Sequence, residues 1–423
     1  MWQDYVIYLK MYVQRKCVGR WLLMKRDVDR FLAEKKLESL LFYSDSFSNA
    51  NMYYLTGFLA PDPFIFLKKV DEDPTLIVNQ LELARAKKES RVKDVRSYFD
   101  YDFMSIVKST SDPRDGMMKF VASAAKKELG AEAQICVPPN FSVILADALR
   151  SSGLKVKPAF DVVEKARETK EREEIEAVAS VQKTVEEATG KVIDLIAGAD
   201  PGPKGNLYFR ENGKKRLVTV GKLRSVLDHI FVDRGCIDEN DSIIACGPYG
   251  AMGHYFGKPG DVLKANETLV LDIFPKSVRS RYFSDMTRTV VKGRAPKEIK
   301  KMFETVLQVR NAAIDAIKAG VIGKDMQSLC YDIFEKAGYQ TTRGGKQVVK
   351  GYNHSLGHGV GLEVHEGPGM GELSKFPLEE HNVVTVEPGL YDPEVGGVRI
   401  EDIVEVTKKG CRNLTEMEIN LEV

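Results

Sequence analysis

Four carboxylates lie inside apolar runs that predict β-strands in the second half of the chain. Asp272 interrupts LVLDIF, Asp285 lies in YFSDMTRTVV, Glu387 lies in VVTVEPGLY, and Glu401 lies in VGGVRIEDIVEV. A carboxylate is costly to bury unless a partner satisfies its charge. These four positions therefore demand a source of positive charge inside a folded core.

The acids fall into two pairs with turn-like sequences between their members. Asp272 and Asp285 are thirteen residues apart with KSVRSR between them, and Glu387 and Glu401 are fourteen residues apart around DPEVGG. A hairpin at each place would bring the two acids of a pair side by side. The sequence thus predicts four carboxylates in an apolar setting.

Basic residues near these acids are too few to neutralise them. The same segments supply Arg288 and Arg399, so four separate salt bridges are the weaker interpretation. Two divalent cations would supply the missing charge and would hold a hydroxide between them. We therefore expect a site for two metal ions.

Histidines gather in one glycine-rich stretch, NHSLGHGVGLEVHE at 353–366. It holds His354, His358 and His365, which are half of the six histidines in the chain. A lone histidine is usually structural, but this cluster predicts an imidazole ligand. The stretch lacks the βαβ context of a dinucleotide fingerprint and is no H-E-x-x-H helix. His254, in GAMGHYFG, is a further candidate for which a structural role is equally reasonable.

The first part of the chain predicts an α/β domain with a partly parallel sheet, because strands and helices alternate. Its clearest helix covers 112–130, where Asp112 can cap the first turn. We place this domain at 24–160 and a second, catalytic domain at 161–423. Residues 1–23 are expected to be an extension. They do not have the order of a secretory signal, since the basic residues follow the apolar ones.

Periodicity gives a coarse plan of the second domain. We expect helices and strands in the order helix 168–197, hairpin 199–217, helix 220–235, strands 268–274 and 282–291, helices 297–319 and 324–337, and strands near 383–391 and 397–406.

Charge and cysteine usage exclude several classes of function. The chain has 62 basic and 61 acidic side chains, a net charge of +1, which gives no reason to expect nucleic acid or an anionic membrane as a partner. No apolar run approaches the roughly 18–20 residues of a membrane span. The six cysteines are scattered, which suits a reducing cytoplasm and buried apolar roles for the thiols.

The ligand order Asp272, Asp285, His358, Glu387 and Glu401 resembles that of the pita-bread metallopeptidases. The phrases LVLDIF, SDMTRTV, GHGVGLEVHE, TVEPGLY and VRIEDIVEV carry the resemblance, which extends over about 25–423. Within this family the chain is most similar to the Xaa-Pro peptidases, prolidase and aminopeptidase P. NMYYLTGF at 51–58 resembles the creatinase-type N-terminal domain, and ARETKEREEIE at 166–176 resembles the start of the catalytic domain. The implied fold is an α/β N-terminal domain plus an α+β pita-bread catalytic domain.

The resemblance implies a role for each ligand. Asp272 would bind one metal through both oxygens, while Asp285 and Glu401 would bridge both metals. His358 and Glu387 would complete the second site. Glu387 would also move protons between the attacking water and the leaving amine. The oxygen-rich set suits manganese best, with cobalt, zinc or iron as alternatives.

The resemblance also implies substrate contacts and partners. His365 would hydrogen-bond the substrate carbonyl as it becomes tetrahedral, His254 would help to hold the prolyl residue, and His354 would line the same pocket. Arg399 matches a basic residue that orients acids and substrate. The implied partners are a peptide substrate and a second copy of the chain in a homodimer.

The expected function is hydrolysis of the Xaa-Pro bond at the N-terminus of dipeptides or short peptides by a hydroxide that bridges two metals. Two alternatives remain open: another reaction on the same scaffold, of the lyase or amidinohydrolase kind, and a non-catalytic interaction module. The chain departs from the family pattern at MGHYFG around His254 and at the inserted-looking residues 199–217. Both departures concern the substrate pocket rather than the metal ligands.

Overall fold

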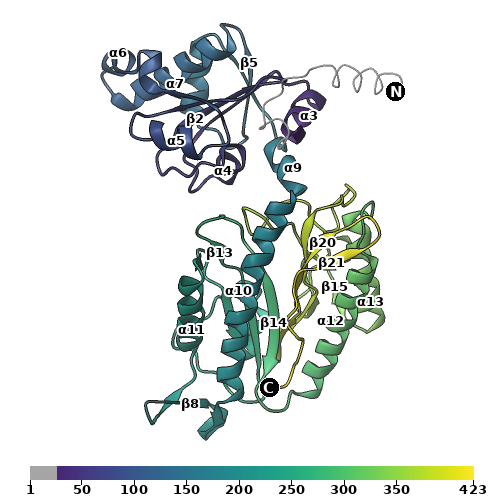
Figure 1. Cartoon of the computed structure of the whole chain (residues 1–423). Coiled ribbons are helices and arrows are strands. Elements are labelled where there is room, and N and C mark those ends of the chain that lie inside the picture. The colour runs from purple at the N-terminus through teal and green to yellow at the C-terminus, as the bar shows by residue number, and fades with distance from the viewer. Residues whose placement is uncertain (1–25) are drawn as a thin grey trace. The chain divides into compact units, whose positions relative to one another are not determined.

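The computed structural model describes residues 26–423 and divides the chain into two compact units, the second of which begins at Glu168 (Figure 1). This division falls seven residues after the predicted end of the first domain at 160, and that boundary stays a prediction. The extension expected at 1–23 and Cys17 lie outside the described residues.

The first unit is built on a mixed six-stranded sheet in the order β4-β3-β2-β1-β5-β6. Its strands are β1 (Ser39–Ser44), β2 (Phe64–Lys69), β3 (Thr75–Val78), β4 (Asp94–Ser97), β5 (Gln134–Val137) and β6 (Lys155–Pro158). The pairs β1–β5, β5–β6 and β3–β4 are parallel, and β1–β2 and β2–β3 are antiparallel. The partly parallel sheet expected from the sequence is confirmed.

The helices of this part of the chain are α3 (Arg26–Glu34), α4 (Ala50–Thr56), α5 (Leu83–Glu89), α6 (Phe103–Lys108), α7 (Pro113–Leu129), α8 (Val143–Ser151) and α9 (Val163–Glu168). The α4, α7 and α8 helices each begin directly after a residue whose side chain accepts a backbone hydrogen bond. Asp112 caps α7 by accepting a hydrogen bond from the backbone N–H of Arg114, and Gly130 follows its last residue. The α7 helix is therefore the one predicted.

The second unit contains two similar halves, each with two helices over a three-stranded antiparallel sheet (Figure 1). In the first half, α10 (Arg172–Ala197) and α11 (Val220–Asp233) pack on β11 (Ile243–Cys246), β12 (Thr268–Ile273) and β14 (Met286–Val291). In the second half, α12 (Lys297–Ala316) and α13 (Gly323–Lys336) pack on β17 (Val383–Val386) and β20 (Asp402–Val406), with β21 (Cys411–Asn413) at the edge.

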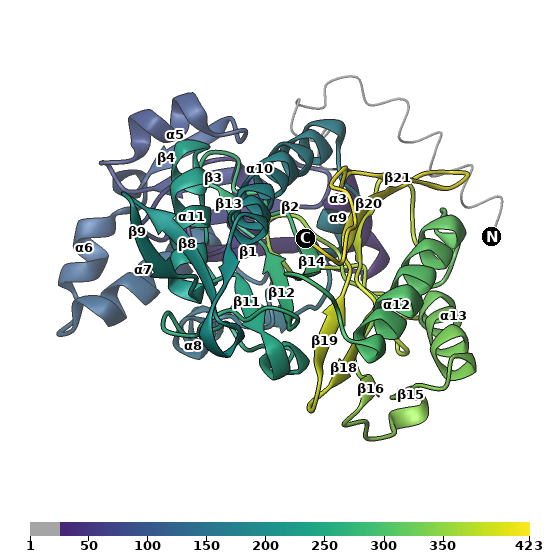
Figure 2. The same cartoon turned by 90° about the horizontal axis from the view of Figure 1, so that it is seen from below.

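Shorter elements complete this unit. A hairpin of β18 (Gly389–Asp392) and β19 (Gly396–Arg399) lies between the two helix pairs in Figure 2. The predicted hairpin within 199–217 is present as β8 (Leu207–Glu211) and β9 (Lys214–Leu217), next to the short β7 (Asp200–Pro201). The other short strands are β10 (Cys236–Ile237), β13 (Lys276–Ser277), β15 (Gln340–Thr341) and β16 (Gly351–Tyr352), and the single helical turns are η2 (Pro203–Gly205), η3 (Gly247–Ala251) and η4 (Arg343–Gly345).

Strand alternation places apolar side chains under the helices and polar ones on the opposite face. In β12, Leu269, Leu271 and Ile273 belong to the core beneath α10 and α11, so Thr268, Val270 and Asp272 face the other way. In β17 and β20, Val384, Val386, Val404 and Val406 belong to the core beneath α12 and α13. The acids therefore lie on sheet faces that the helices leave uncovered.

The two halves are joined along β14. The backbone N–H of Glu401 donates to the carbonyl oxygen of Thr287 at 3.0 Å. The hydroxyl of Thr289 donates to the carbonyl oxygen of Arg399 at 2.9 Å, and the N–H of Arg399 donates back to that hydroxyl at 3.0 Å. These bonds fix the second half against the strand that follows Asp285.

Two predicted elements differ from the structure. The helix expected over 168–197 is broken at 169–171, because Thr169 forms a bridge with Asn382 and the N–H of Lys170 donates to the carbonyl oxygen of His381. The strand expected over 282–291 begins only at Met286. The preceding residues pair elsewhere: the N–H of Phe283 donates to Gly361.

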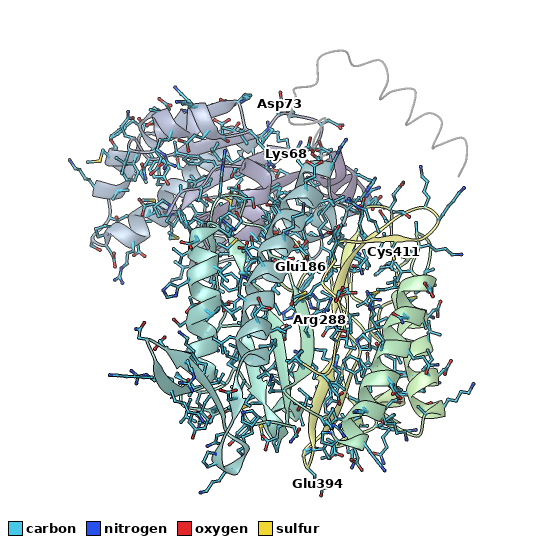
Figure 3. The ribbon with its side chains drawn as sticks, turned by 60° about the horizontal axis from the view of Figure 1, so that its bottom comes forward. Lys68, Asp73, Glu186, Arg288, Glu394 and Cys411 are labelled. Carbon is cyan, nitrogen blue, oxygen red and sulfur yellow. The ribbon has the colours of Figure 1, made fainter. Side chains whose placement is uncertain are left out.

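A buried charge cluster ties α12 to both sheets. Arg288, which Figure 3 labels, donates to Asp402 at 2.9 Å and to the carbonyl oxygens of Glu401 and Met417. Arg310 of α12 pairs with the second oxygen of Asp402. Arg288 therefore neutralises a carboxylate other than the four predicted ones.

Replacing Asp402 with alanine would leave two guanidinium groups close together without their shared carboxylate. We expect Asp402→Ala to lower the free energy of unfolding by roughly 3–5 kcal/mol, measured by guanidinium chloride unfolding. Glu176→Ala is the matched control, because Glu176 pairs with Arg172 at the surface and such pairs contribute roughly 0–1 kcal/mol. Equal unfolding midpoints for the two variants would contradict the role given to Asp402.

Candidate metal centre

The first acid pair is set by the β12–β14 ladder. Asp272 lies opposite Thr287, and Ile273 lies opposite Met286, so Asp285 directly precedes β14 at the end of the ladder where Asp272 lies. Both carboxylates are buried. Because side chains alternate along a strand, Thr287 shares the face of Asp285 and Arg288 points to the other face.

The second acid pair lies at a break between two ladders. The β17–β20 ladder ends with Val386 opposite Asp402, and the β18–β19 ladder ends with Gly389 opposite Arg399. Glu387 and Glu401 lie between these two ladders, so their backbone N–H groups donate to residues outside both ladders. Glu387 donates to the carbonyl oxygen of Leu356 at 2.9 Å, and Glu401 donates to β14 as described above. The break thus brings the histidine-rich stretch and β14 to the same place.

His358 is fixed next to both acid pairs. Its backbone N–H donates to the hydroxyl of Thr385 at 3.0 Å, and its carbonyl oxygen accepts from the N–H of Thr385 at 2.8 Å. Its Nε2 lies 3.2 Å from Glu387 Oε1 and 3.7 Å from Asp285 Oδ2. Asp285, His358 and Glu401 each offer a ligand atom within 4.8 Å of the others. The structure therefore groups acids from both hairpins around one imidazole.

Asp272 is held by a chain of hydrogen bonds that ends at His354. Arg399 pairs with Asp272 Oδ2 and donates through Nη1 to the Tyr391 hydroxyl at 3.0 Å. His354 Nδ1 lies 2.8 Å from the carbonyl oxygen of Ser355, so Nδ1 carries the proton in the neutral ring. Its Nε2 therefore accepts from the Tyr391 hydroxyl at 2.9 Å. The chain fixes the guanidinium that faces the acids.

Threonine hydroxyls orient two of the acids. Thr287 donates to Glu401 Oε2 at 2.7 Å and accepts from Arg399 Nε at 3.1 Å. Thr385 donates to Glu387 Oε1 at 3.3 Å. Sequence reasoning missed both threonines and Tyr391. Only their positions in the sequence could have indicated them. Thr287 lies two residues after Asp285, Thr385 lies two residues before Glu387, and Tyr391 lies four residues after Glu387.

His365 and His254 lie at the exposed side of the cluster. The His365 ring packs edge-on against His358, with centroids 4.3 Å apart and an interplanar angle of 77°. Burial and the charge of His358 lower the pKa of His365, and His254 contributes to this shift. His254 is likewise exposed.

A buried ion pair holds the loop that carries His365. Lys170 Nζ lies 2.7 Å from Glu366 Oε1, with both side chains almost fully buried. Gly359 and Glu366 exchange two backbone hydrogen bonds of 2.9 and 3.0 Å, which close the loop between His358 and His365. Lys170 thus connects the start of the catalytic unit to the segment next to the acids.

Crowding of the acids shifts their protonation. Burial and the charges of Glu401, Asp272 and Glu387 raise the pKa of Asp285 well above its ordinary value. Burial and the charges of Glu387 and Asp272 raise the pKa of Glu401 to about 8. In the absence of a cation these carboxyls retain protons at neutral pH, because burial and mutual repulsion both disfavour their charged forms.

Glu387 and His358 form an ion pair within this group of acids. Burial alone would raise the pKa of Glu387, but the hydrogen bond from His358 and the nearby positive charges lower it to about 2. Burial alone would lower the pKa of His358, but Glu387 and Glu401 raise it to about 9. A proton on His358 therefore offsets part of the negative charge of these acids.

The residues fit a pair of divalent cations. Asp285 Oδ1 is buried and has no hydrogen-bond partner, although unpaired buried oxygens are costly. Four carboxylates and one imidazole form an oxygen-rich set of the kind that manganese and similar ions prefer. The carboxyl groups with raised pKa values would release their protons when cations bind. The roles of Asp272, Asp285, His358, Glu387 and Glu401 as ligands stay predictions.

The buried acids and His358 form an oxygen-rich group that could bind divalent cations. Comparison with known families supports this interpretation. The profile of metallopeptidase family M24 matches residues 164–408, and that of the creatinase/prolidase N-terminal domain matches 26–169. The chain therefore belongs to metallopeptidase family M24, with a creatinase-type N-terminal domain before a pita-bread catalytic domain.

Named relatives match over nearly the whole chain. An Xaa-Pro dipeptidase of Pyrococcus horikoshii is 28% identical over 398 residues, which are 94% of this chain and 97% of the relative. The solved prolidase of Pyrococcus furiosus has a TM-score of 0.71 at 25% identity, covering 92% and 99% of the two chains. The X-Pro aminopeptidase of Thermotoga maritima has a TM-score of 0.73 at 25% identity, covering 93% and 100%.

Two further features bear on the sequence-based expectations. Among the residues that the structure describes, no helix combines the length and the apolar character that a membrane span requires. Within 26–423 the cysteines are free thiols, four of them buried and Cys411 half-buried.

The metal-free protein should lose stability as the pH rises from 6 to 8. Asp285 and Glu401 have raised pKa values in the folded state, so the folded chain binds more protons than the unfolded chain in this range. His358 acts in the same direction, because its stabilising charge is lost as the pH rises toward 9. The lowered pKa of Glu387 contributes a constant term above pH 5.

We expect Glu401 alone to reduce the free energy of unfolding by roughly 2 kcal/mol between pH 6 and 8. Chemical unfolding with EDTA present measures this loss. Glu401→Gln, which imitates the protonated carboxyl, should show a smaller pH dependence, and added Mn²⁺ should diminish it in the wild type. A flat profile for the metal-free wild type would refute the crowding argument.

Proposed function

We propose that the protein is a two-metal exopeptidase that hydrolyses the Xaa-Pro bond at the N-terminus of dipeptides or short peptides. The observation that carries the proposal is the group of Asp285, Glu387 and Glu401 around His358, in which Asp285 Oδ1 has no hydrogen-bond partner. Membership of family M24 and full-length relatives named Xaa-Pro dipeptidase support it.

The five predicted ligands would hold two divalent cations. When bound, these cations would lower the pKa of a water molecule and polarise the scissile carbonyl group. Manganese is the favoured metal, because the ligand set is rich in oxygen.

Side chains of this protein would transfer protons, stabilise the developing negative charge and hold the ligands in position. Glu387 would take a proton from the attacking water and give it to the leaving nitrogen. His365, neutral because its pKa is lowered, would donate a hydrogen bond to the carbonyl oxygen as charge develops there. Arg399 would keep Asp272 and Tyr391 in place.

Substrate contacts and assembly complete the proposal. His254 and His354 would contact the prolyl residue, together with His365. The half-buried His354 ring is already oriented by Tyr391. A homodimer is proposed from the family resemblance, and a cytoplasmic location from the scattered free cysteines.

Metal removal should abolish peptide cleavage. We expect the protein treated with EDTA to be inactive on Xaa-Pro dipeptides, and Mn²⁺ or Co²⁺ to restore release of the N-terminal residue. The assay measures free amino acids released from Leu-Pro, Leu-Pro-Gly and Leu-Ala. Faster cleavage of Leu-Pro than of Leu-Pro-Gly indicates a dipeptidase, and the reverse indicates an aminopeptidase.

Two other outcomes of these experiments would favour a different function. Binding of two metal ions, measured by calorimetry, without cleavage of either prolyl peptide would favour another reaction on the same ligand set. Absence of metal binding would favour an interaction module.

His365 should act on the transition state rather than on metal binding. We expect His365→Ala to lower kcat roughly 100- to 1,000-fold, the typical effect of losing one donor to a developing oxyanion, with an unchanged metal content. His229→Ala is the matched control, because His229 is an exposed histidine on α11. Steady-state kinetics with Leu-Pro and metal analysis of both variants provide the test. Loss of metal from His365→Ala would show a structural role instead.

A further inference from the structure

A glutamine occupies a core position of α13. Met326, Cys330 and Phe334 on the buried side of this helix belong to the apolar core of the second half, and Gln327 beside them is 1% exposed. Burying an amide is costly unless hydrogen bonds replace those that it made with water. The amide of Gln327 therefore needs partners inside the protein.

The two ends of this amide hold two backbone groups of one segment, residues 354–356. Nε2 donates to the carbonyl oxygen of His354 at 3.1 Å, and Oε1 accepts from the N–H of Leu356 at 2.6 Å. The same N–H also donates to the carbonyl oxygen of Met370 at 3.1 Å. Residues 354–356 belong to no strand or helix, so the Gln327 side chain supplies bonds that a neighbouring strand would otherwise provide.

Tyr352 adds a third contact to the same amide. Its hydroxyl donates to Gln327 Oε1 at 3.4 Å. Its fully buried ring packs edge-on against the His354 ring, with centroids 5.0 Å apart and an interplanar angle of 68°. The position of the His354 ring is therefore set by Gln327 through the backbone, by the packing of Tyr352, and by the hydrogen bond from Tyr391.

The segment held by Gln327 also contacts one of the acids. The carbonyl oxygen of Leu356 accepts from the N–H of Glu387 at 2.9 Å, at the break where neither ladder continues. His354 Nδ1 lies 4.0 Å from Glu387 Oε2. A displacement of residues 354–356 would therefore move Glu387 as well as His354.

We propose that Gln327 is a positioning residue that holds His354 and Glu387 in the geometry needed to bind the substrate and the cations. The inference rests on the proposed function, since it takes His354 as a contact of the prolyl residue and Glu387 as a metal ligand. Gln327 acts through the backbone of residues 354–356. Without its amide, the carbonyl oxygen of His354 would lose its donor and the N–H of Leu356 would bond to Met370 alone, so the segment would shift away from α13.

The test replaces the amide with an apolar side chain of similar length in Gln327→Met. We expect KM for Leu-Pro in the Mn²⁺-loaded protein to rise roughly tenfold, the factor that one lost hydrogen bond produces. The Kd for Mn²⁺, measured by calorimetry on the metal-free protein, should also rise roughly tenfold, because residues that orient metal ligands have effects of this size. Thr305→Val is the matched control. It removes the hydrogen bond of a buried side chain on α12 and should change neither quantity.

Further measurements separate positioning from a general loss of stability. In a His354→Ala background, Gln327→Met should raise KM no further, because the side chain through which it acts on the substrate is already missing. Amide hydrogen exchange of peptides covering 352–358 should accelerate in Gln327→Met, while exchange of β12 and β14 stays unchanged. Gln327→Asn keeps the amide but is too short to reach both backbone groups. It should show the same changes and replaces Gln327→Met if that variant does not fold.

These measurements also distinguish failure of the inference from failure of the proposed function. If the wild type cleaves no prolyl peptide but the Gln327 variants bind Mn²⁺ more weakly and exchange faster over 352–358, the proposed function fails and the positioning role stands. Unchanged KM, Mn²⁺ affinity and exchange in the Gln327 variants overturn the role. KM effects of Gln327→Met and His354→Ala that multiply in the double variant overturn it as well.

Discussion

Mutual repulsion of four buried carboxylates is the constraint on which the catalytic unit depends. Burial and neighbouring anions together raise the pKa values of Asp285 and Glu401, and the Arg399 guanidinium and the His358 imidazole are the positive groups next to the acids. Such a cluster is unfavourable in a protein that only needs to fold, since apolar residues of the same size would be more stable. The cluster therefore fits a cation site better than a purely structural role.

The two similar halves of the unit explain how the cluster is assembled. Each half covers one face of its sheet with helices and leaves the other face open. The open face of the first half carries Asp272 and Asp285, and the ladder break in the second half carries Glu387 and Glu401. Backbone bonds along β14 lock the halves together. The acids therefore meet only where both halves are correctly packed.

Neutral hydroxyl groups around the acids orient the charged side chains without adding charge of their own. Thr287 and Thr385 each direct one carboxylate, and Tyr391 connects Arg399 to His354. These partners hold the side chains in the geometry that cation binding requires, so that little reorganisation would be needed.

The sequence predicted much of this arrangement because buried charge is conspicuous. Asp272 in LVLDIF could not be explained by local partners, and the helix at α7 followed from its caps. The break at 169–171 was not foreseeable, because it depends on backbone bonds to residues more than two hundred positions away.

The face of the sheet to which a given side chain points was partly predictable from the sequence. Arg288 lies three residues from Asp285, and an odd separation in a strand predicts opposite faces. Tyr391 gave no signal, since a tyrosine in an apolar strand is ordinary and only the fold brings its hydroxyl to Arg399.

Because the acids come from segments more than a hundred residues apart, a bound cation would act as a cross-link that holds the two halves of the catalytic unit together. Ligands that bind only the folded state stabilise it in proportion to the logarithm of their concentration. Metal supply in the cell would then determine how long each copy survives proteolysis, as well as whether it is active. A cell with little available metal would then contain less of the protein, rather than the same amount in an inactive, metal-free form.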